Sequence, residues 1–163
     1  MSVKDFFDKK VQKDREKLQK EMDKKKEEKE QLQIKIKAII PLMNEFYSIF
    51  LELQKQIKEH DYNSSLLAPP STDPATGISY IHKIVLGDIR KSFPSASYKN
   101  VSSDEIFKNN YISCIVDSDY ESITFSLSVN AQIPKTYVHK ITEDLASLPD
   151  KYTEELLTMI LGD

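Results

Sequence analysis

The first sixty residues contain no glycine, and a hydrophobic repeat runs through most of them. They are rich in Lys, Glu, Gln and Leu, all of which favour helix. A ladder with alternating steps of four and three residues begins at Val11 and ends at Ile57, and eleven of its fourteen positions are apolar. A repeat of 3.5 residues makes helices supercoil around one another. Residues 1–60 are therefore predicted to form a coiled-coil oligomerisation helix.

The ladder predicts an oligomer interface, because a lone helix would leave this stripe in water. The expected partner is a second copy of the chain or a related coiled-coil subunit. The remaining ladder positions are Arg15, Lys25 and Lys29, which would repel their copies in a parallel dimer, so the helix direction and the number of chains stay open. The predicted interface consists of the eleven apolar positions: Val11, Leu18, Met22, Leu32, Ile36, Ile39, Met43, Phe46, Phe50, Leu53 and Ile57.

Pro41 lies inside this helix, where proline removes a hydrogen bond and costs about 3 kcal/mol. It falls at the outermost heptad position, and no Gly, Asn or Ser lies beside it to form a turn. We expect a kink there rather than a break, and the alternative is a helical hairpin that folds back near residue 41. From Ile34 onward the stripe widens through Ile40, Leu42, Tyr47 and Ile49, which indicates either a four-helix arrangement or docking of a C-terminal domain.

Residues 61–77 are predicted to be a linker, because they combine three prolines with small polar residues and Gly77, although an ordered surface loop has the same composition. Residues 78–163 are predicted to form a small α+β head. Within the head, residues 78–93 favour a strand over a helix, and residues 103–107 suit a short helical turn.

Residues 111–117 and 122–130 of the head predict an antiparallel hairpin, since Ile123, Phe125 and Leu127 alternate with polar residues. Two helices are expected to close the chain. The first begins near Pro134 and extends to Leu148, and the second ends at Gly162. The predicted fold class is thus α+β: a long N-terminal coiled-coil helix, then a small antiparallel-sheet head closed by two C-terminal helices.

Little in the sequence points to catalysis. Three scattered glycines provide neither a phosphate-binding loop nor a dinucleotide fingerprint. His60, His82 and His139 lie far apart, and Cys114, the single cysteine, cannot form a disulfide within the chain. The spacing of Asp117, Asp119 and Glu121 is similar to the first part of a calcium-binding loop. However, serines occupy the positions where that loop has its glycine and its bidentate glutamate, so a polar hairpin turn is expected instead. We therefore predict no cofactor, no metal and no enzymatic activity.

The charge distribution argues against nucleic acid as a partner. Residues 1–60 carry 15 Lys and Arg against 12 Asp and Glu, and their signs alternate, as is typical of a solvated helix. Residues 61–163 carry 8 against 14, which disfavours a phosphate backbone. Because the chain starts with charged residues and has no long apolar run, we expect an intracellular protein, cytoplasmic or nuclear, that does not enter a membrane.

The expected layout, an N-terminal coiled coil followed by a compact α+β head, is similar to that of kinetochore subunits with RWD-like heads. Residues 145–157 (LASLPDKYTEELL) resemble the C-terminal Leu-x-x-Leu-Pro-x-Tyr segment of the monopolin coiled-coil subunit, with Lys151 as one extra residue before Tyr152. This resemblance implies a homodimer or heterodimer whose heads grip kinetochore peptides. It transfers no individual binding residue.

Three function classes follow from these observations. The leading hypothesis is a non-enzymatic scaffold or adaptor that oligomerises through its coiled coil and binds a protein or peptide partner through its head. The alternative is a chaperone or secretion-type adaptor that holds a client on the wide apolar stripe of residues 40–49. The third is an enzyme of unfamiliar type that uses Asp117, Asp119 and Glu121.

Overall fold

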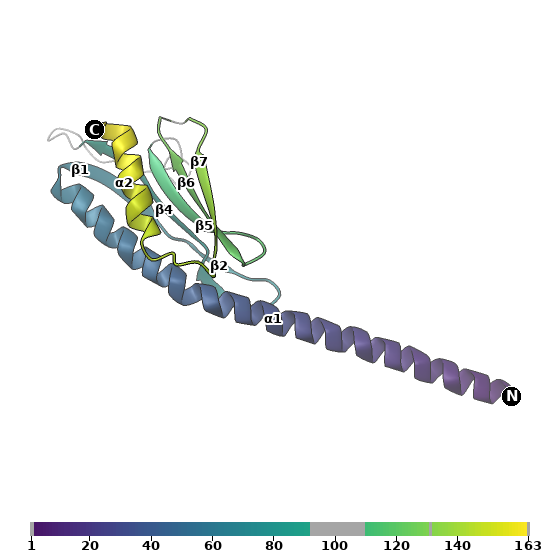
Figure 1. Cartoon of the computed structure of the whole chain (residues 1–163). Helices are drawn as coiled ribbons and strands as arrows, with labels where there is room; N and C mark the ends of the chain where they lie inside the picture. The colour runs from purple at the N-terminus through teal and green to yellow at the C-terminus, as the bar shows by residue number, and fades with distance from the viewer. Residues whose placement is uncertain (1, 92–109, 131, 163) are drawn as a thin grey trace.

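The computed structural model describes residues 2–91, 110–130 and 132–162, and it has an α+β fold. A long helix precedes a five-stranded antiparallel sheet, a small two-stranded sheet and a C-terminal helix (Figure 1). The expected helical turn at residues 103–107 lies outside the described residues. The elements in chain order are α1 (Val3–Glu59), β1 (Tyr62–Leu67), β2 (Pro70–Thr72), β3 (Ser79–Ile81), β4 (Lys83–Lys91), β5 (Tyr111–Val116), β6 (Ser122–Ser128), β7 (Lys135–Lys140) and α2 (Leu148–Leu161).

Helix α1 is continuous over 57 residues, which confirms the long N-terminal helix. A capping box begins it: the Ser2 hydroxyl accepts from the Asp5 amide, and the Asp5 carboxylate accepts from the Ser2 amide. Pro41 lies inside the helix and is exposed, so its ring is on the solvent side. The alternative of a helical hairpin folding back near residue 41 is wrong. Instead, α1 curves gently along the head (Figure 1).

The five-stranded sheet has the order β1-β4-β5-β6-β7, with every neighbouring pair antiparallel. The predicted hairpin is confirmed as β5 and β6, in which Cys114 lies opposite Phe125. Residues 79–81 form β3 and residues 83–91 form β4, as the strand interpretation predicts. On β6, Ile123, Phe125 and Leu127 are fully buried while the residues between them are only partly buried, as expected for a sheet with one face on a core.

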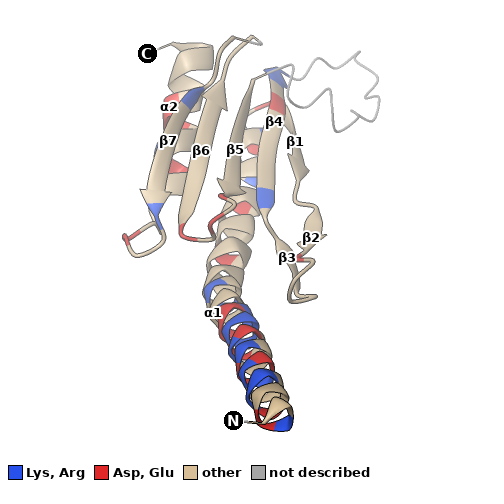
Figure 2. Ribbon diagram, turned by 90° about the vertical axis from the view of Figure 1, so that its right-hand side faces the viewer, with Lys and Arg blue, Asp and Glu red and all other residues tan. Residues whose placement is uncertain are grey.

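The core lies between this sheet face and the C-terminal half of α1, with α2 completing the cover (Figures 1 and 2). The widened stripe therefore docks on a C-terminal domain, one of the two arrangements that the sequence indicates. Phe46 contacts Phe125 with ring centroids 5.8 Å apart, and Phe125 contacts Tyr152 of α2 at 5.1 Å. Burying side chains of this size stabilises the fold by about 1.5–3 kcal/mol each.

The segment predicted to be a linker contains two strands. Residues 62–67 form β1, which pairs with β4 and places Leu66 opposite Leu86. Pro70 occupies the first residue of β2, a position where the missing amide hydrogen is tolerated. The prolines thus come after β1, and the segment is not a linker without secondary structure.

The first of the two predicted C-terminal helices is wrong. Residues 135–140 form the edge strand β7, and α2 is the only C-terminal helix among the described residues. The reason is the free edge of β6, which supplies backbone partners to Thr136, Tyr137 and Val138, residue types that favour strands. Tyr137 and His139 then face α2, where the Tyr137 ring stacks on Tyr152 at 4.5 Å.

Candidate functional site: two interaction surfaces

The eleven predicted interface residues fall into two groups in the structure. Val11, Leu18 and Met22 are 47%, 58% and 57% exposed, and they lie on the part of α1 that projects away from the head (Figure 1). We call residues 3–31 the free rod. Leu32 and Leu53 are partly buried against the head. The other six belong to the core of their own subunit: Ile36, Ile39, Met43, Phe46, Phe50 and Ile57.

Most of the surface of the free rod is charged or polar. Acidic and basic residues are interspersed along it (Figure 2). Lys10 and Asp14 form an ion pair at 3.1 Å, and Gln19 donates to Asp23 at 2.9 Å, both across one helical turn. Its exposed large apolar side chains are Val3, Phe6, Phe7, Val11, Leu18 and Met22. The rod is thus polar enough to project into solvent, yet it carries an uncovered apolar stripe.

The head begins at a defined point on α1. The Lys35 ammonium pairs with the Glu121 carboxylate of the β5–β6 turn at 2.8 Å. One residue later, Ile36 is fully buried. The ladder therefore changes from exposed at Lys29 to buried at Ile36, within about two helical turns.

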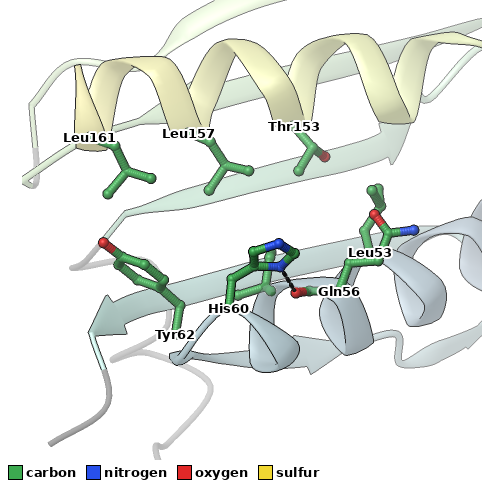
Figure 3. Close-up of a pocket in the computed structure, with 8 residues that line it drawn as sticks. Leu53, Gln56, His60, Tyr62, Thr153, Leu157 and Leu161 are labelled. Atoms are coloured by element: carbon green, nitrogen blue, oxygen red, sulfur yellow. Dashed lines mark hydrogen bonds between the residues drawn. The ribbon is translucent and has the colours of Figure 1, made fainter. Parts of the chain in front are cut away.

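A second surface is an apolar groove between the C-terminal end of α1, the start of β1 and α2 (Figure 3). Its volume is about 480 Å³. Leu53, Ile57, Leu157 and Leu161 supply most of the apolar lining, and Gln56, His60, Tyr62 and Thr153 add polar groups. A groove of this size and lining can accept one or two apolar side chains of a partner.

Two polar side chains that line the groove differ in exposure, since Thr153 is buried and His60 is exposed. The Thr153 hydroxyl is buried and has no hydrogen-bond partner within the described chain. The His60 imidazole donates through Nδ1 to the Gln56 carbonyl at 2.8 Å, which leaves Nε2 of the neutral ring as an acceptor. The sequence did not point to this groove, because its lining comes from segments about a hundred residues apart.

The acidic cluster of the β5–β6 turn is built into the hairpin. Asp117 accepts from the hydroxyls of Ser122 at 2.7 Å and Thr124 at 2.8 Å, and Asp119 accepts from the Glu121 amide at 2.9 Å. Within the described residues, no group of three or more His, Cys, Asp or Glu side chains is placed to hold a metal ion. These contacts match the polar-turn interpretation.

The histidines and the cysteine do not converge on one site. His139 donates to Glu143 at 3.0 Å and lies 2.6 Å from the Tyr152 hydroxyl, so it connects β7 to α2. Burial lowers the pKa of His82 and raises that of the fully buried Cys114 thiol. A raised thiol pKa disfavours the nucleophilic thiolate.

The client surface of the chaperone alternative is occupied by the protein itself. Ile40, Leu42, Tyr47 and Ile49 are all partly buried and pack against the core of the head. A client could reach this stripe only if the head moved away from α1.

No family model, curated protein or solved structure matches this chain. In the described part of the chain, no helix is both long enough and apolar enough to cross a bilayer.

Proposed function

We propose that this protein is a non-enzymatic scaffold or adaptor that self-associates through the free rod and binds a protein partner through its head. The observation that carries the proposal is the exposed stripe of Val11, Leu18 and Met22 on a helix that projects from the head. Most of the stability of helices in proteins comes from packing an amphipathic face. A projecting helix with such a face is therefore suited to pairing with another helix.

The head supports the second half of the proposal through the groove between α1 and α2. The groove combines an apolar lining with polar groups from Gln56, His60 and Tyr62, a mixture that suits an apolar side chain of a peptide and one of its backbone polar groups. The resemblance to kinetochore subunits suggests that kinetochore peptides should be among the first partners tested.

The oligomeric state tests the assembly half. We expect sedimentation velocity to show a concentration-dependent dimer at up to about 50 µM, since an association with micromolar Kd is populated in that range. Replacing both Leu18 and Met22 with Gln should give a monomer with an unchanged head. The matched control replaces Lys13 and Lys20, which lie on the opposite face of the rod, with Gln. A wild-type protein that remains monomeric over this range would reject self-association.

A further inference from the structure

We infer that the free rod pairs with the free rod of a second copy in the antiparallel direction, so that Val11 of each copy faces Met22 of the other. This inference rests on the proposed self-association and adds its direction and register. Three features of the molecule support it: the place where the head begins, the length of the rod and the charges along its seam.

The position of the head disfavours a parallel pair. The ladder keeps its spacing from Met22 through Leu32 to Ile36, so one face of α1 continues from the free rod into the head. From Ile36 onward that face is fully buried against the subunit's own sheet. A parallel second helix lying on the same face would enter the space that the sheet fills. An antiparallel second helix reaches its N-terminal end there instead.

The length of the rod fits this arrangement. With Val11 opposite Met22, Val3 of one copy lies opposite Glu30 of the other, just before Leu32 and the Lys35–Glu121 ion pair. The paired region is then the whole free rod, roughly 43 Å at 1.5 Å per residue. Neither helix overlaps a head, and neither leaves a long unpaired end.

The charges along the seam favour the same register. Asp8 lies opposite Lys25 of the second copy, and Leu18 lies opposite Arg15, whose aliphatic stem can cover it. Along one flank, Asp5 lies near Lys26 of the second copy. Each of these contacts occurs twice in a two-fold pair. A parallel pair in register instead places Arg15, Lys25 and Lys29 each against its own copy.

Neighbouring antiparallel registers lose these contacts. A shift of one heptad in one direction places Arg15 opposite Lys25, and a shift in the other places Val11 opposite Arg15. The favoured register has two like-charge contacts. Lys4 and Lys29 meet at the exposed ends, where solvent screens them, and Asp14 approaches Glu21 while already paired with Lys10 at 3.1 Å.

Disulfide trapping distinguishes the directions. Val11→Cys and Met22→Cys are made separately, with the unsubstituted protein as control because Cys114 is fully buried. In the antiparallel pair, each new cysteine lies roughly 16 Å along the rod from its own copy, beyond the ~7 Å Cα separation that a disulfide spans. We therefore expect mild oxidation to crosslink the mixture of the two variants and neither variant alone. A parallel pair would crosslink each variant with itself, and that result would overturn the inference.

A second measurement leaves the seam intact. Glu27→Cys places a spin label on the outer face of the rod, and antiparallel copies hold the two labels roughly 32 Å apart along the axis. Labels at the same level would overturn the inference, as would dimers in which no cysteine pair crosslinks. Sedimentation of the same samples separates the two proposals: a dimer with parallel labels leaves self-association standing, whereas a monomer rejects both.

Discussion

The Tyr120 hydroxyl donates a 2.7 Å hydrogen bond to the Asp73 carboxylate and so joins the β5–β6 turn to the turn between β2 and β3. Asp73 also accepts from the amide and the hydroxyl of Thr76, both at 2.8 Å, and it is only 6% exposed. The hydrogen bond from Tyr120 is the main reason that the pKa of Asp73 is lowered. A short segment that the sequence suggests to be a linker is thereby fixed to the head.

Asp73→Asn should destabilise the head at pH 7 by about 1–3 kcal/mol. The substitution replaces a charged acceptor with a neutral one, so the hydrogen bonds that Asp73 accepts become weaker. Since the folded-state pKa of Asp73 is lowered, its stabilisation is present above the unfolded-state pKa of about 3.9 and is lost as pH falls through the folded-state value. Urea unfolding should therefore show a difference between wild type and variant that shrinks below about pH 4. Asp23→Asn on the free rod serves as the control, with an expected change within about 0.5 kcal/mol. A difference that stayed constant down to pH 2 would contradict this account.

Thr153→Val tests the buried hydroxyl of the groove. Valine keeps the shape of the side chain and removes a polar atom that has no partner within the described chain, so the free energy of unfolding should rise by about 1 kcal/mol. Chemical denaturation measures this directly, and Thr158→Val is the comparison, because the Thr158 hydroxyl donates to the Glu154 carbonyl at 3.0 Å. If Thr153→Val were the more destabilising change, the hydroxyl would have to be hydrogen-bonded in solution.

The sequence predicts the length of α1 but not what covers it. A four-three ladder shows that one helix face is buried, and it does not distinguish a second helix from a sheet. Only the widening from Ile34 onward separates the part that meets the head from the free rod, where Val11, Leu18 and Met22 form a narrower stripe. The coiled-coil prediction treats both parts alike.

Two strands depend on partners that are distant in sequence. Tyr137, Ile141 and Leu145 fit the spacing of a helix, but the free edge of β6 makes residues 135–140 a strand. Residues 62–67 show no alternation of polar and apolar side chains, and β4 supplies their hydrogen bonds. The hairpin of β5 and β6 was predictable because its alternation and its turn are both local. The groove was not, because Leu53 and Leu157 meet only after folding.

Pro41→Ala should raise the free energy of unfolding of the head by about 1–3 kcal/mol. The substitution restores a backbone donor in the middle of α1 and removes the clash of the proline ring with the preceding turn, and the site is exposed. Thermal and urea unfolding provide the measurement, with the exposed neighbour Lys37→Ala as the control. Destabilisation by Pro41→Ala would mean that proline at this position helps α1 to follow the sheet.

Lys25→Glu should weaken self-association of the free rod. In the antiparallel register it places a second carboxylate opposite Asp8 at two symmetric positions, and a loss of about 0.7 kcal/mol at each raises the dissociation constant about tenfold. The double variant Asp8→Lys with Lys25→Glu reverses both charges, so its affinity should return to within about threefold of wild type. Lys24→Glu is the matched control, since it makes the same charge change on the outer face of the rod. In a parallel dimer, Lys25→Glu only exchanges one like-charge pair for another, so equal affinities for the Lys25→Glu and Lys24→Glu proteins would contradict the antiparallel register.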